Sequence, residues 1–501
     1  MKRRRRARPD PGRAFAPPAA PSTGATEVER LRQENERLRK LLEEQAKRIA
    51  DLERQLALKQ QNSTITSKPP SSDGLAGQPR TRGRRKKSRR KPGGQPGHPG
   101  HHRPLRPPDQ VDAIIDHVPT HCGGCAHRLR ERDTVGPPRR HQVTELPAIA
   151  AHITEHRCHR RQCPDCGRIT VAALPEDSVS QFGPQLTALI AYLTVVCRLP
   201  RLVVQRFLEG ALQIPISLGS TQHAWEEASA AVVAPCAELE AALPHQAVLN
   251  VDETGHRTNG AKRWMWAFVA RTFIVYRITA SRGSDVLKTM LGETFAGTLG
   301  SDRLPAYLTY VVGQRQLCWA HVTRNVLSAL DLARTPSARR FCREALALDR
   351  RLFRLWHRFR DDPEARGAPL TRAELIAKVL PIEKRLFALG ERSLNAANDE
   401  VRNLATAFFV HNQHFFTFVH EDGVSPTNNA AERALRTAVQ WRKIMFGTRS
   451  DDGERAVERL LTIAQTCQLQ QLNVLAYLTA AIVAHRRRES VASLLRRPHT
   501  P

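Results

Sequence analysis

A heptad repeat near the N-terminus constrains the fold of this chain more than any other pattern. Side chains that suit a helix–helix seam recur from residue 28 to residue 56 at alternating intervals of three and four. They are Val28, Leu31, Asn35, Leu38, Leu42, Gln45, Ile49, Leu52 and Leu56. Four heptads with this spacing predict a leucine-zipper coiled coil over residues 27–60.

The predicted partner of this helix is a second copy of the chain. With Val28 at heptad position a, Asn35 also falls at a, where one buried asparagine favours a parallel dimer in a single register. The flanking positions bring opposite charges together between the copies, in the pairs Glu34–Arg39 and Arg48–Glu53. The sequence therefore predicts a homodimer or larger assembly through residues 28–56. The alternative is a single, solvated helix.

Net charge indicates the class of partner. The 501 residues carry 78 Lys and Arg against 49 Asp and Glu, which gives a net charge of +29. Such a balance favours a polyanion, most often nucleic acid, although a basic surface without a partner is the alternative. The densest run, Arg80–Lys91, holds nine positive residues and no acid. We expect it to grip DNA phosphates, through residues that include Arg84, Arg85, Lys86 and Lys87.

Length and composition predict several domains and no membrane segment. Residues 1–26 are expected to form a disordered basic tail, residues 61–110 a basic Pro/Gly-rich linker, and residues 481–501 a second basic tail. No stretch approaches the roughly 20 apolar residues of a membrane span. The basic N-terminus lacks an apolar signal core. These features predict a cytoplasmic protein with no membrane partner.

Two pairs of cysteines predict a zinc ribbon over residues 111–175. Cys122 and Cys125 form one C-x-x-C pair, and Cys163 and Cys166 form the other, with 37 residues between the pairs. Four thiolates at such spacing are typical of a structural Zn²⁺ site, which has no open position for catalysis. The connecting stretch alternates in polarity over Ile149–Cys158. Three neighbours could replace one ligand: His156, Cys158 and His159.

Residues 176–240 have a helical pattern with breaks at prolines. The expected helices are Gln185–Val196, Arg201–Leu212 and Ser220–Val232. Short helices joined by such turns can form a helix-turn-helix that binds DNA. Helical packing without DNA contact is the alternative interpretation.

The pattern changes to strands after His245. The expected strands are Val248–Asp252, Arg263–Ala270, Phe273–Ala280, a strand that ends at Asp302, and Gln316–Ala320, with a helix over Ser284–Leu291 before the fourth. Three strands, a helix and two further strands are typical of a ribonuclease H-like core. Its first part would span residues 241–330, and its second part residues 415–480, with a helical insertion over residues 331–414 between them. The expected fold class is therefore multidomain α/β.

Three acids are predicted to meet at one edge of this core. Asp252 and Asp302 are expected at strand ends, and Glu432 in a helix over Asn428–Gln440 that Thr427 can cap. Three such carboxylates can hold two Mg²⁺ ions about 3.5–4 Å apart, an arrangement suited to phosphodiester chemistry. Each acid alone has an ordinary structural explanation.

Several other residues invite a functional interpretation. Arg436 and Lys443 follow Glu432 by four and eleven residues, on one helical face, and suit DNA phosphates or plain surface charge. Within Cys318-Trp-Ala-His321, followed by Arg324, the histidine could neighbour a metal, contact DNA or be structural. Trp264 and Trp266 are expected in the core, with DNA stacking as the alternative for one of them. Asp285 is a poorer catalytic candidate, because its neighbours look helical.

Taken together, these motifs resemble the insertion-sequence transposases with a DDE active site, and more narrowly the large transposase subunit of the IS sixty-six family. The resemblance extends from the zipper to about residue 480. It is carried by Gln95-Pro-Gly-His98, the paired C-x-x-C motif, Asn250-Val-Asp-Glu-Thr254, Cys318-Trp-Ala-His321 and Thr427-Asn-Asn-Ala-Ala-Glu432-Arg-Ala-Leu-Arg436. Thr427 departs from the family, many of whose members have Asp at that position.

The resemblance implies a function and a catalytic set. Asp252, Asp302 and Glu432 would be the catalytic triad on a ribonuclease H-like fold, using Mg²⁺ or Mn²⁺. The protein would cleave and transfer DNA strands at the ends of a mobile element in a prokaryotic cell, associated with the nucleoid, with accessory proteins of the same element as further partners. The alternatives are a non-catalytic DNA-binding regulator, a nuclease without strand transfer, and a decayed transposase.

Overall fold

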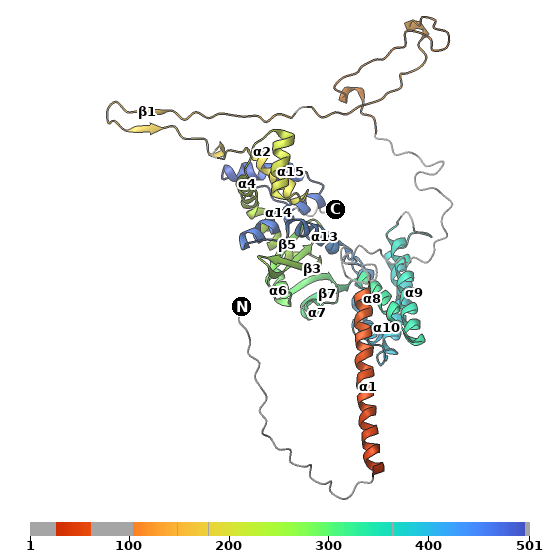
Figure 1. Ribbon diagram of the computed structural model, residues 1–501. Coiled ribbons are helices and arrows are strands. Elements are labelled where there is room, and N and C mark those ends of the chain that lie inside the picture. Colours follow the sequence, from red (N-terminus) through yellow and green to blue (C-terminus); the bar gives the residue numbers. More distant parts are fainter. Residues whose placement is uncertain (1–26, 62–103, 148, 179, 363–364, 496–501) are drawn as a thin grey trace, which may run out of the picture.

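The computed structural model describes residues 27–61, 104–147, 149–178, 180–362 and 365–495. The predicted tail 1–26 and the basic run with Arg84, Arg85, Lys86 and Lys87 lie outside these residues. Figure 1 shows a central body of helices and strands, one long separate helix, and an extended stretch that carries the cysteine pairs. Among the described residues, no helix has the length and apolar character needed to cross a membrane.

The heptad repeat forms one continuous helix, α1 (Glu27–Gln60), as the spacing predicts. Its seam faces solvent in the single chain, with Leu42 68% exposed and Leu56 57% exposed. Near its C-terminal end the helix contacts the rest of the described chain. There Gln61 exchanges hydrogen bonds with the hydroxyl and carbonyl of Ser328, and Arg54 pairs with Asp399 at 2.7 Å. The helix is therefore fixed at one end, and its apolar stripe is uncovered along its length.

A helical bundle precedes the sheet, close to where the sequence predicts helices. Its members are α2 (Pro184–Val195), α3 (Arg201–Leu212), α4 (Leu218–Ala231) and α5 (Val233–Ala241). The hydroxyl of Ser217 caps α4 by accepting from the amide of Ser220 at 3.0 Å. Helix α4 packs against α2, α3 and α14 (Asp451–Leu469) and buries Trp225 and Ala228. This packing favours the interpretation in which α4 supports the bundle rather than entering a DNA groove.

One mixed, five-stranded sheet forms the centre of the molecule, in the order β5-β4-β3-β6-β7. The first three strands along the chain pair antiparallel, whereas β6 and β7 run parallel to β3. Their bounds are β3 (Val248–Thr258), β4 (Ala261–Val269), β5 (Ile274–Thr279), β6 (Thr294–Ser301) and β7 (Val311–Leu317). Helices α6 (Ser284–Leu291) and α7 (Pro305–Thr309) connect the parallel strands. The sheet and its connecting helices thus form a mixed α/β structure, in agreement with the predicted fold class.

Two strand boundaries differ from the prediction. Strand β3 does not end at Asp252 but continues to Thr258, because Asn259 and Gly260 form a two-residue turn with positive φ (47° and 79°) that lets β3 pair along the whole of β4. The last strand lies earlier than Gln316–Ala320. It ends at Leu317, and the chain turns into a helix directly after Cys318.

A helical insertion separates β7 from the rest of the core, as the sequence predicts. It consists of α8 (Trp319–Leu332), α9 (Pro336–Phe359), α10 (Arg372–Glu391), α11 (Asp399–Val410) and α12 (Thr417–His420). The insertion has its own apolar core, in which the rings of Phe341 and Phe408 stack with centroids 5.9 Å apart. Thr371 and Glu374 form a capping box at the start of α10. The insertion is therefore a separately packed unit attached to the sheet.

The chain then returns to the sheet through α13 (Asn429–Met445), α14 and α15 (Val474–Arg486). Helix α13 packs on β3 and β4, and α14 runs along β5. Helix α15 continues into the segment predicted as a C-terminal tail, and Leu494 beyond it is 2% exposed.

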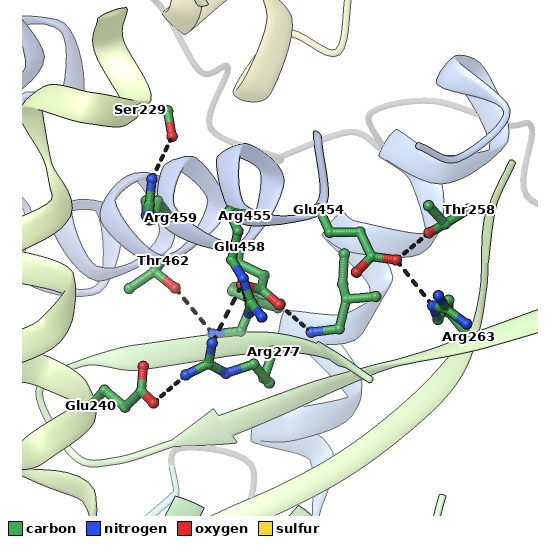
Figure 2. Close-up of polar contacts among 12 residues, drawn as sticks. Ser229, Glu240, Thr258, Arg263, Arg277, Glu454, Arg455, Glu458, Arg459 and Thr462 are labelled. Carbon is green, nitrogen blue, oxygen red and sulfur yellow. Dashed lines mark hydrogen bonds and ion pairs between the residues drawn. The ribbon is translucent and has the colours of Figure 1, made fainter. Parts of the chain in front are cut away.

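Side chains close both edges of the sheet. Alternate amides of β5 donate to side chains that are one turn apart on α14: Ile278 to Glu458 (2.6 Å), Tyr276 to Thr462 (3.0 Å) and Ile274 to Thr466 (3.1 Å). Figure 2 shows the contacts made by Glu458 and Thr462, with Arg277 between Glu240 and Glu458. At the other edge, the amide of Phe418 donates to the side chain of Gln316, and Thr417 donates to the carbonyl of Arg315. Three amides of β5 and the carbonyl of Arg315 on β7 are thus occupied by side chains.

Candidate active site

Strand register brings Asp252 and Asp302 together. Strands β3 and β6 pair Asn250 with Gly300, so each acid lies two residues beyond the same pair, on neighbouring parallel strands. Such strands are about 4.8 Å apart. Gly300 permits this approach, because a Cβ atom there would lie 2.5 Å from Oδ1 of Asn250. Asp302 also accepts a hydrogen bond from the amide of Leu304 at 2.8 Å, where the chain turns into α7.

Glu432 approaches the two aspartates from the first turn of α13. The start of this helix is tied to the sheet by Asn428, which is 1% exposed. The side-chain amide of Asn428 donates to the carbonyl of Val251 at 2.8 Å, and its backbone amide lies 3.1 Å from Sγ of Cys318. One buried residue therefore joins β3, the start of α8 and α13. The expected cap by Thr427 is wrong, since α13 begins at Asn429 and no side chain caps it.

The electrostatics of Asp252 follow from this convergence. Burial raises the pKa of its carboxyl well above the ordinary value, and the charges of Glu253, Asp302 and Glu432 raise it further. Like charges in a poorly solvated place disfavour ionisation unless a cation is bound. The three predicted acids therefore lie close enough to influence one another, and their charge would attract a cation, but within the described residues their carboxylate oxygens do not all lie within 4.8 Å of one another.

Glu432 has basic neighbours from α8. Nη2 of Arg324 lies 2.9 Å from its Oε1 atom, and Nδ1 of His321 lies 3.5 Å from the same atom. His321 Nδ1 is buried and forms no hydrogen bond. Because the two basic side chains are one turn apart on α8, that helix holds Glu432 toward the insertion.

Cys318, His321 and Glu432 form a group that could hold a metal, since one ligand atom of each lies within 4.8 Å of the others. Burial raises the pKa of the Cys318 thiol to about 11. A thiolate, an imidazole and a carboxylate suit a transition metal better than Mg²⁺. For His321, the structure thus supports the metal-neighbour interpretation made from the sequence.

Glu253 is a buried acid that the sequence reasoning missed. As the neighbour of Asp252 on a strand, it points to the opposite face, where Nε and Nη2 of Arg282 donate to it at 2.8 and 2.6 Å and Tyr307 donates its hydroxyl. Burial raises the pKa of Glu253, and the hydrogen bonds from Tyr307 and Arg282 oppose that rise. An acid at an inward-facing position of a strand was the signal that could have revealed it.

The two tryptophans of β4 have different surroundings. Trp266 is fully buried and meets the ring of Tyr307 edge-on, which confirms the prediction that it belongs to the core. Trp264 is partly buried between two cations, Lys262 and Arg282, which lie 4.8 and 4.4 Å from its ring centroid. Asp285, the poorer candidate, is exposed on α6 as its helical neighbours predicted.

A cleft of about 510 Å³ opens beside the acids. Asp302 and His321 line one side, and residues of α11, among them Asn403 and Thr406, line the other. The cleft therefore lies between the sheet and the insertion. Along α13, Arg436 and Lys443 are exposed and lie on the helical face of Glu432, because the helix continues through both.

The cysteine pairs adopt two separate turns. The amide of Cys122 donates to the carbonyl of His127, and that of Cys163 donates to the carbonyl of Arg168. Hydrogen bonds from the following backbone amides lower the pKa of both leading thiols, Cys122 and Cys163. The second turn joins two short strands, β1 (Arg160–Gln162) and β2 (Ile169–Val171).

The structure does not bring the two pairs together. Figure 1 shows the first described residues after residue 103 and the hairpin of β1 at separate ends of an extended stretch. No three of the pairs' four sulfurs form a metal-ligand group within the described residues, and neither do His156, Cys158 and His159. The stretch Ile149–Cys158, despite its alternating polarity, forms no strand in the part that the structure describes.

Comparison with known families identifies the class of protein. Residues 179–456, more than half of the chain, match the model of the Transposase IS66 family, and the chain belongs to this family. This confirms the resemblance indicated by the motifs, and the matched range includes Asp252, Asp302 and Glu432. Residues 17–104 match a family of unknown function (DUF6444).

A curated relative gives a more distant comparison. The chain is 24% identical over 247 residues to the uncharacterized protein y4qI of Sinorhizobium fredii (strain NBRC 101917 / NGR234). The match covers 44% of this chain and 43% of that protein, so the chain spans less than half the length of this relative.

Proposed function

We propose that this protein is a DDE transposase that cleaves and transfers DNA strands at the ends of an insertion sequence. Asp252, Asp302 and Glu432 are the catalytic carboxylates in this proposal. The observation that carries it is the convergence of acids from two adjacent parallel strands and a facing helix, reflected in the raised pKa of Asp252. Family membership supports the same class of activity.

The residues present fit a pair of divalent cations. Carboxylate oxygens are the ligands that Mg²⁺ and Mn²⁺ prefer, and the charges of Glu253, Asp302 and Glu432 all raise the pKa of Asp252. Two such ions, when bound, would activate an attacking oxygen and stabilise the leaving oxygen at a phosphodiester. Asp252 and Asp302 would hold them from the sheet, and Glu432 from α13.

The reaction proceeds in two displacements at phosphorus. Water attacks the phosphodiester at the element end, the bond to the 3′-oxygen breaks, and a free 3′-hydroxyl remains. That hydroxyl then attacks a phosphodiester of the target DNA, whose own 3′-oxygen leaves. In both steps the chain's part is to position Asp252, Asp302 and Glu432, with Arg324 and His321 orienting Glu432.

The strand order supports a ribonuclease H-like core. Three antiparallel strands followed by two parallel ones, in the order β5-β4-β3-β6-β7, agree with the order predicted for residues 241–330. The helical insertion, predicted over residues 331–414, then separates Asp302 from Glu432. In this proposal the second part of the core, residues 415–480, supplies the third carboxylate.

The modules outside the core complete the proposal. Residues 28–56 form a coiled coil that makes a homodimer or larger assembly, supported by the uncovered seam of α1. Residues 111–175 form a zinc ribbon in which a structural Zn²⁺ draws Cys122, Cys125, Cys163 and Cys166 together. Element ends and target DNA are bound through phosphate contacts, and the contributing residues are Arg84, Arg85, Lys86, Lys87, Arg436 and Lys443. Accessory proteins of the same element and a nucleoid-associated, cytoplasmic location belong to the same proposal.

An end-cleavage assay with Mg²⁺ tests the proposal. Full-length protein is incubated with a duplex that carries the element end, and nicked and joined products are measured for wild type, Asp252→Asn and Glu432→Gln. Both variants should lose cleavage, because each removes one metal-binding charge. Asp285→Asn is the matched control, since Asp285 is an exposed acid on α6. Wild-type rates in either active-site variant would refute the catalytic assignment.

A further inference from the structure

Helix α9 of the insertion carries an unusual excess of positive charge. Its 24 residues include seven arginines, but only two acids, Glu344 and Asp349. Six of the arginines are exposed, and five of these form what we call the arginine ridge: Arg340, Arg343, Arg350, Arg351 and Arg354. This surface lies outside the acidic site and outside the predicted basic arm.

The ridge occupies one side of the helix. At 3.6 residues per turn, its five positions fall within an arc of about 100°. From Arg340 to Arg354 the helix rises about 21 Å, a length over which one strand of duplex DNA presents about six phosphates. The opposite side of α9 packs into the insertion core through Phe341, Leu352 and others. The ridge is therefore a linear array of guanidinium groups on a rigid support.

The two acids of α9 balance only part of the ridge's charge. Asp349 is half-buried against α8, accepts a hydrogen bond from the hydroxyl of Thr323 at 3.1 Å and lies near Arg350. Glu344 pairs with Arg392, directly after α10, and lies beside Arg340 and Arg343. Each acid thus has a partner on a neighbouring element, and two acids cannot balance five arginines.

The ridge arginines also have few partners of their own. In the part of the chain that the structure describes, Arg340, Arg343, Arg350 and Arg351 form no hydrogen bond or ion pair, while Arg354 donates only to the carbonyl of Arg350. Like charges spaced by three or four residues destabilise a helix slightly. An anionic partner would relieve this repulsion between the arginines, and the relief would add to the binding free energy.

We propose that the arginine ridge of α9 binds the phosphate backbone of duplex DNA and so extends the DNA-binding surface onto the insertion. This inference rests on the proposed function, which supplies duplex DNA as the partner. Guanidinium groups pair with phosphate oxygens through two parallel hydrogen bonds, which a set of lysines would not reproduce. Since the contacts are to phosphates, the ridge positions the duplex without reading its sequence.

Salt-dependent binding of the full-length protein tests the inference. Affinity for a labelled duplex is measured by fluorescence anisotropy in EDTA, over a series of salt concentrations, for wild type and for the triple variant Arg340→Gln, Arg343→Gln and Arg350→Gln. Each lost phosphate contact should lower the slope of log K against log salt by about 0.9, or about 2.7 for the three. The affinity should fall at least about tenfold.

The control variant has the same change of charge at another surface of the insertion. Lys378→Gln, Lys384→Gln and Arg385→Gln remove three exposed cations from α10. This variant should retain the wild-type slope. Equal slopes for the two triple variants would overturn the inference, because the ridge would then act only through net charge.

Two features keep the result independent of folding and of catalysis. Glutamine and arginine have similar helix propensities, and the single variant Arg343→Gln should by itself lower the slope by about 0.9. Binding in EDTA needs no metal at the acids, so it is measured separately from cleavage. A ridge variant with a normal slope contradicts this inference alone, whereas a cleaving Asp252→Asn contradicts only the catalytic proposal.

Discussion

The side-chain amide of Asn428 donates a hydrogen bond to the carbonyl oxygen of Val251, the residue directly before Asp252. Through the same residue, the first turn of α13 is fixed relative to Cys318 at the start of α8. The distance between Asp252 on β3 and Glu432 on α13 is therefore set by one buried amide rather than by the acids themselves.

Replacing Asn428 with Ala should weaken both the fold and the active site. The variant leaves the carbonyl of Val251 without its partner in a buried place, at a cost of about 1–3 kcal/mol in the free energy of unfolding. End cleavage should slow as Glu432 loses its position. Denaturant unfolding and single-turnover cleavage measure the two effects. The control is Asn429→Ala, at the exposed neighbouring position, which should change the free energy of unfolding by less than about 0.5 kcal/mol. Equal losses of stability and of cleavage in the two variants would exclude the positioning role of Asn428.

A substitution that makes the active site prefer Mn²⁺ over Mg²⁺ can test whether Asp302 is a metal ligand. Asp302→Cys should reduce cleavage in Mg²⁺ by at least about 10²-fold, because a thiolate is a poor ligand for a hard cation. In Mn²⁺, which accepts sulfur more readily, part of the activity should return. The ratio of rates in the two metals is the measurement. Asp302→Ser, which offers no thiolate, should show no such recovery, and a cysteine variant that is equally inactive in both metals would count against direct ligation.

The stability of the core should fall in mild acid because of His256. Burial, with the charge of Arg442, lowers the pKa of this histidine from 6.5 to about 4, and its Nε2 atom lies 3.1 Å from the hydroxyl of Thr448. The folded state therefore favours the neutral ring. The neutral ring of His256 contributes fully to the free energy of unfolding above pH 6.5, the pKa of the unfolded state. This contribution is lost as the pH falls from 6.5 toward 4, the pKa of the folded state. Between pH 7 and pH 5 this amounts to roughly 2 kcal/mol.

Comparison with His256→Gln isolates that contribution. Urea unfolding of the two proteins should show the wild type losing roughly 2 kcal/mol more than the variant between pH 7 and pH 5. The raised pKa of Asp252 acts in the opposite direction, since protonation relieves that carboxyl, and it affects both proteins equally. Parallel pH profiles for wild type and variant would rule out His256 as the titrating group.

Zinc content tests the predicted ribbon. Purified full-length protein should release one Zn²⁺ per chain on denaturation, and Cys122→Ser and Cys163→Ser should each abolish or greatly reduce that amount, because one site needs ligands from both pairs. Cys197→Ser is the control, since Cys197 is an exposed cysteine outside the pairs. Unchanged zinc in one of the two pair variants would show that the pairs do not share an ion.

Much of the core could be predicted from local patterns. Helices α3 and α6 have the predicted bounds, and β6 ends at Ser301, one residue before the predicted end at Asp302, because proline breaks and alternating apolar residues are local signals. The continuation of β3 to Thr258 was also encoded locally, in Asn259-Gly260, but the polar residues beyond Asp252 concealed it.

The active site depends more on tertiary contacts. Asp252 and Asp302 could be paired from sequence, since parallel strands align their ends. The roles of Asn428, Glu253 and Arg324 could not, because each is defined by a partner more than 25 residues away whose orientation depends on packing. Likewise, the spacing of Cys122 and Cys163 predicted a shared site but contained no information on their separation in space.

The contacts at the borders of the sheet also bear on how this protein could associate with others. On β5 the side chains of Thr462 and Thr466 engage backbone amides, and on β7 the hydroxyl of Thr417 engages the carbonyl of Arg315, so a neighbouring chain could not use these groups to extend the sheet. The uncovered seam of α1 offers copies of the chain a helical contact instead. A coiled coil joins a small, defined number of helices. For the proposed transposase, such a contact would give an assembly of defined size on a pair of DNA ends.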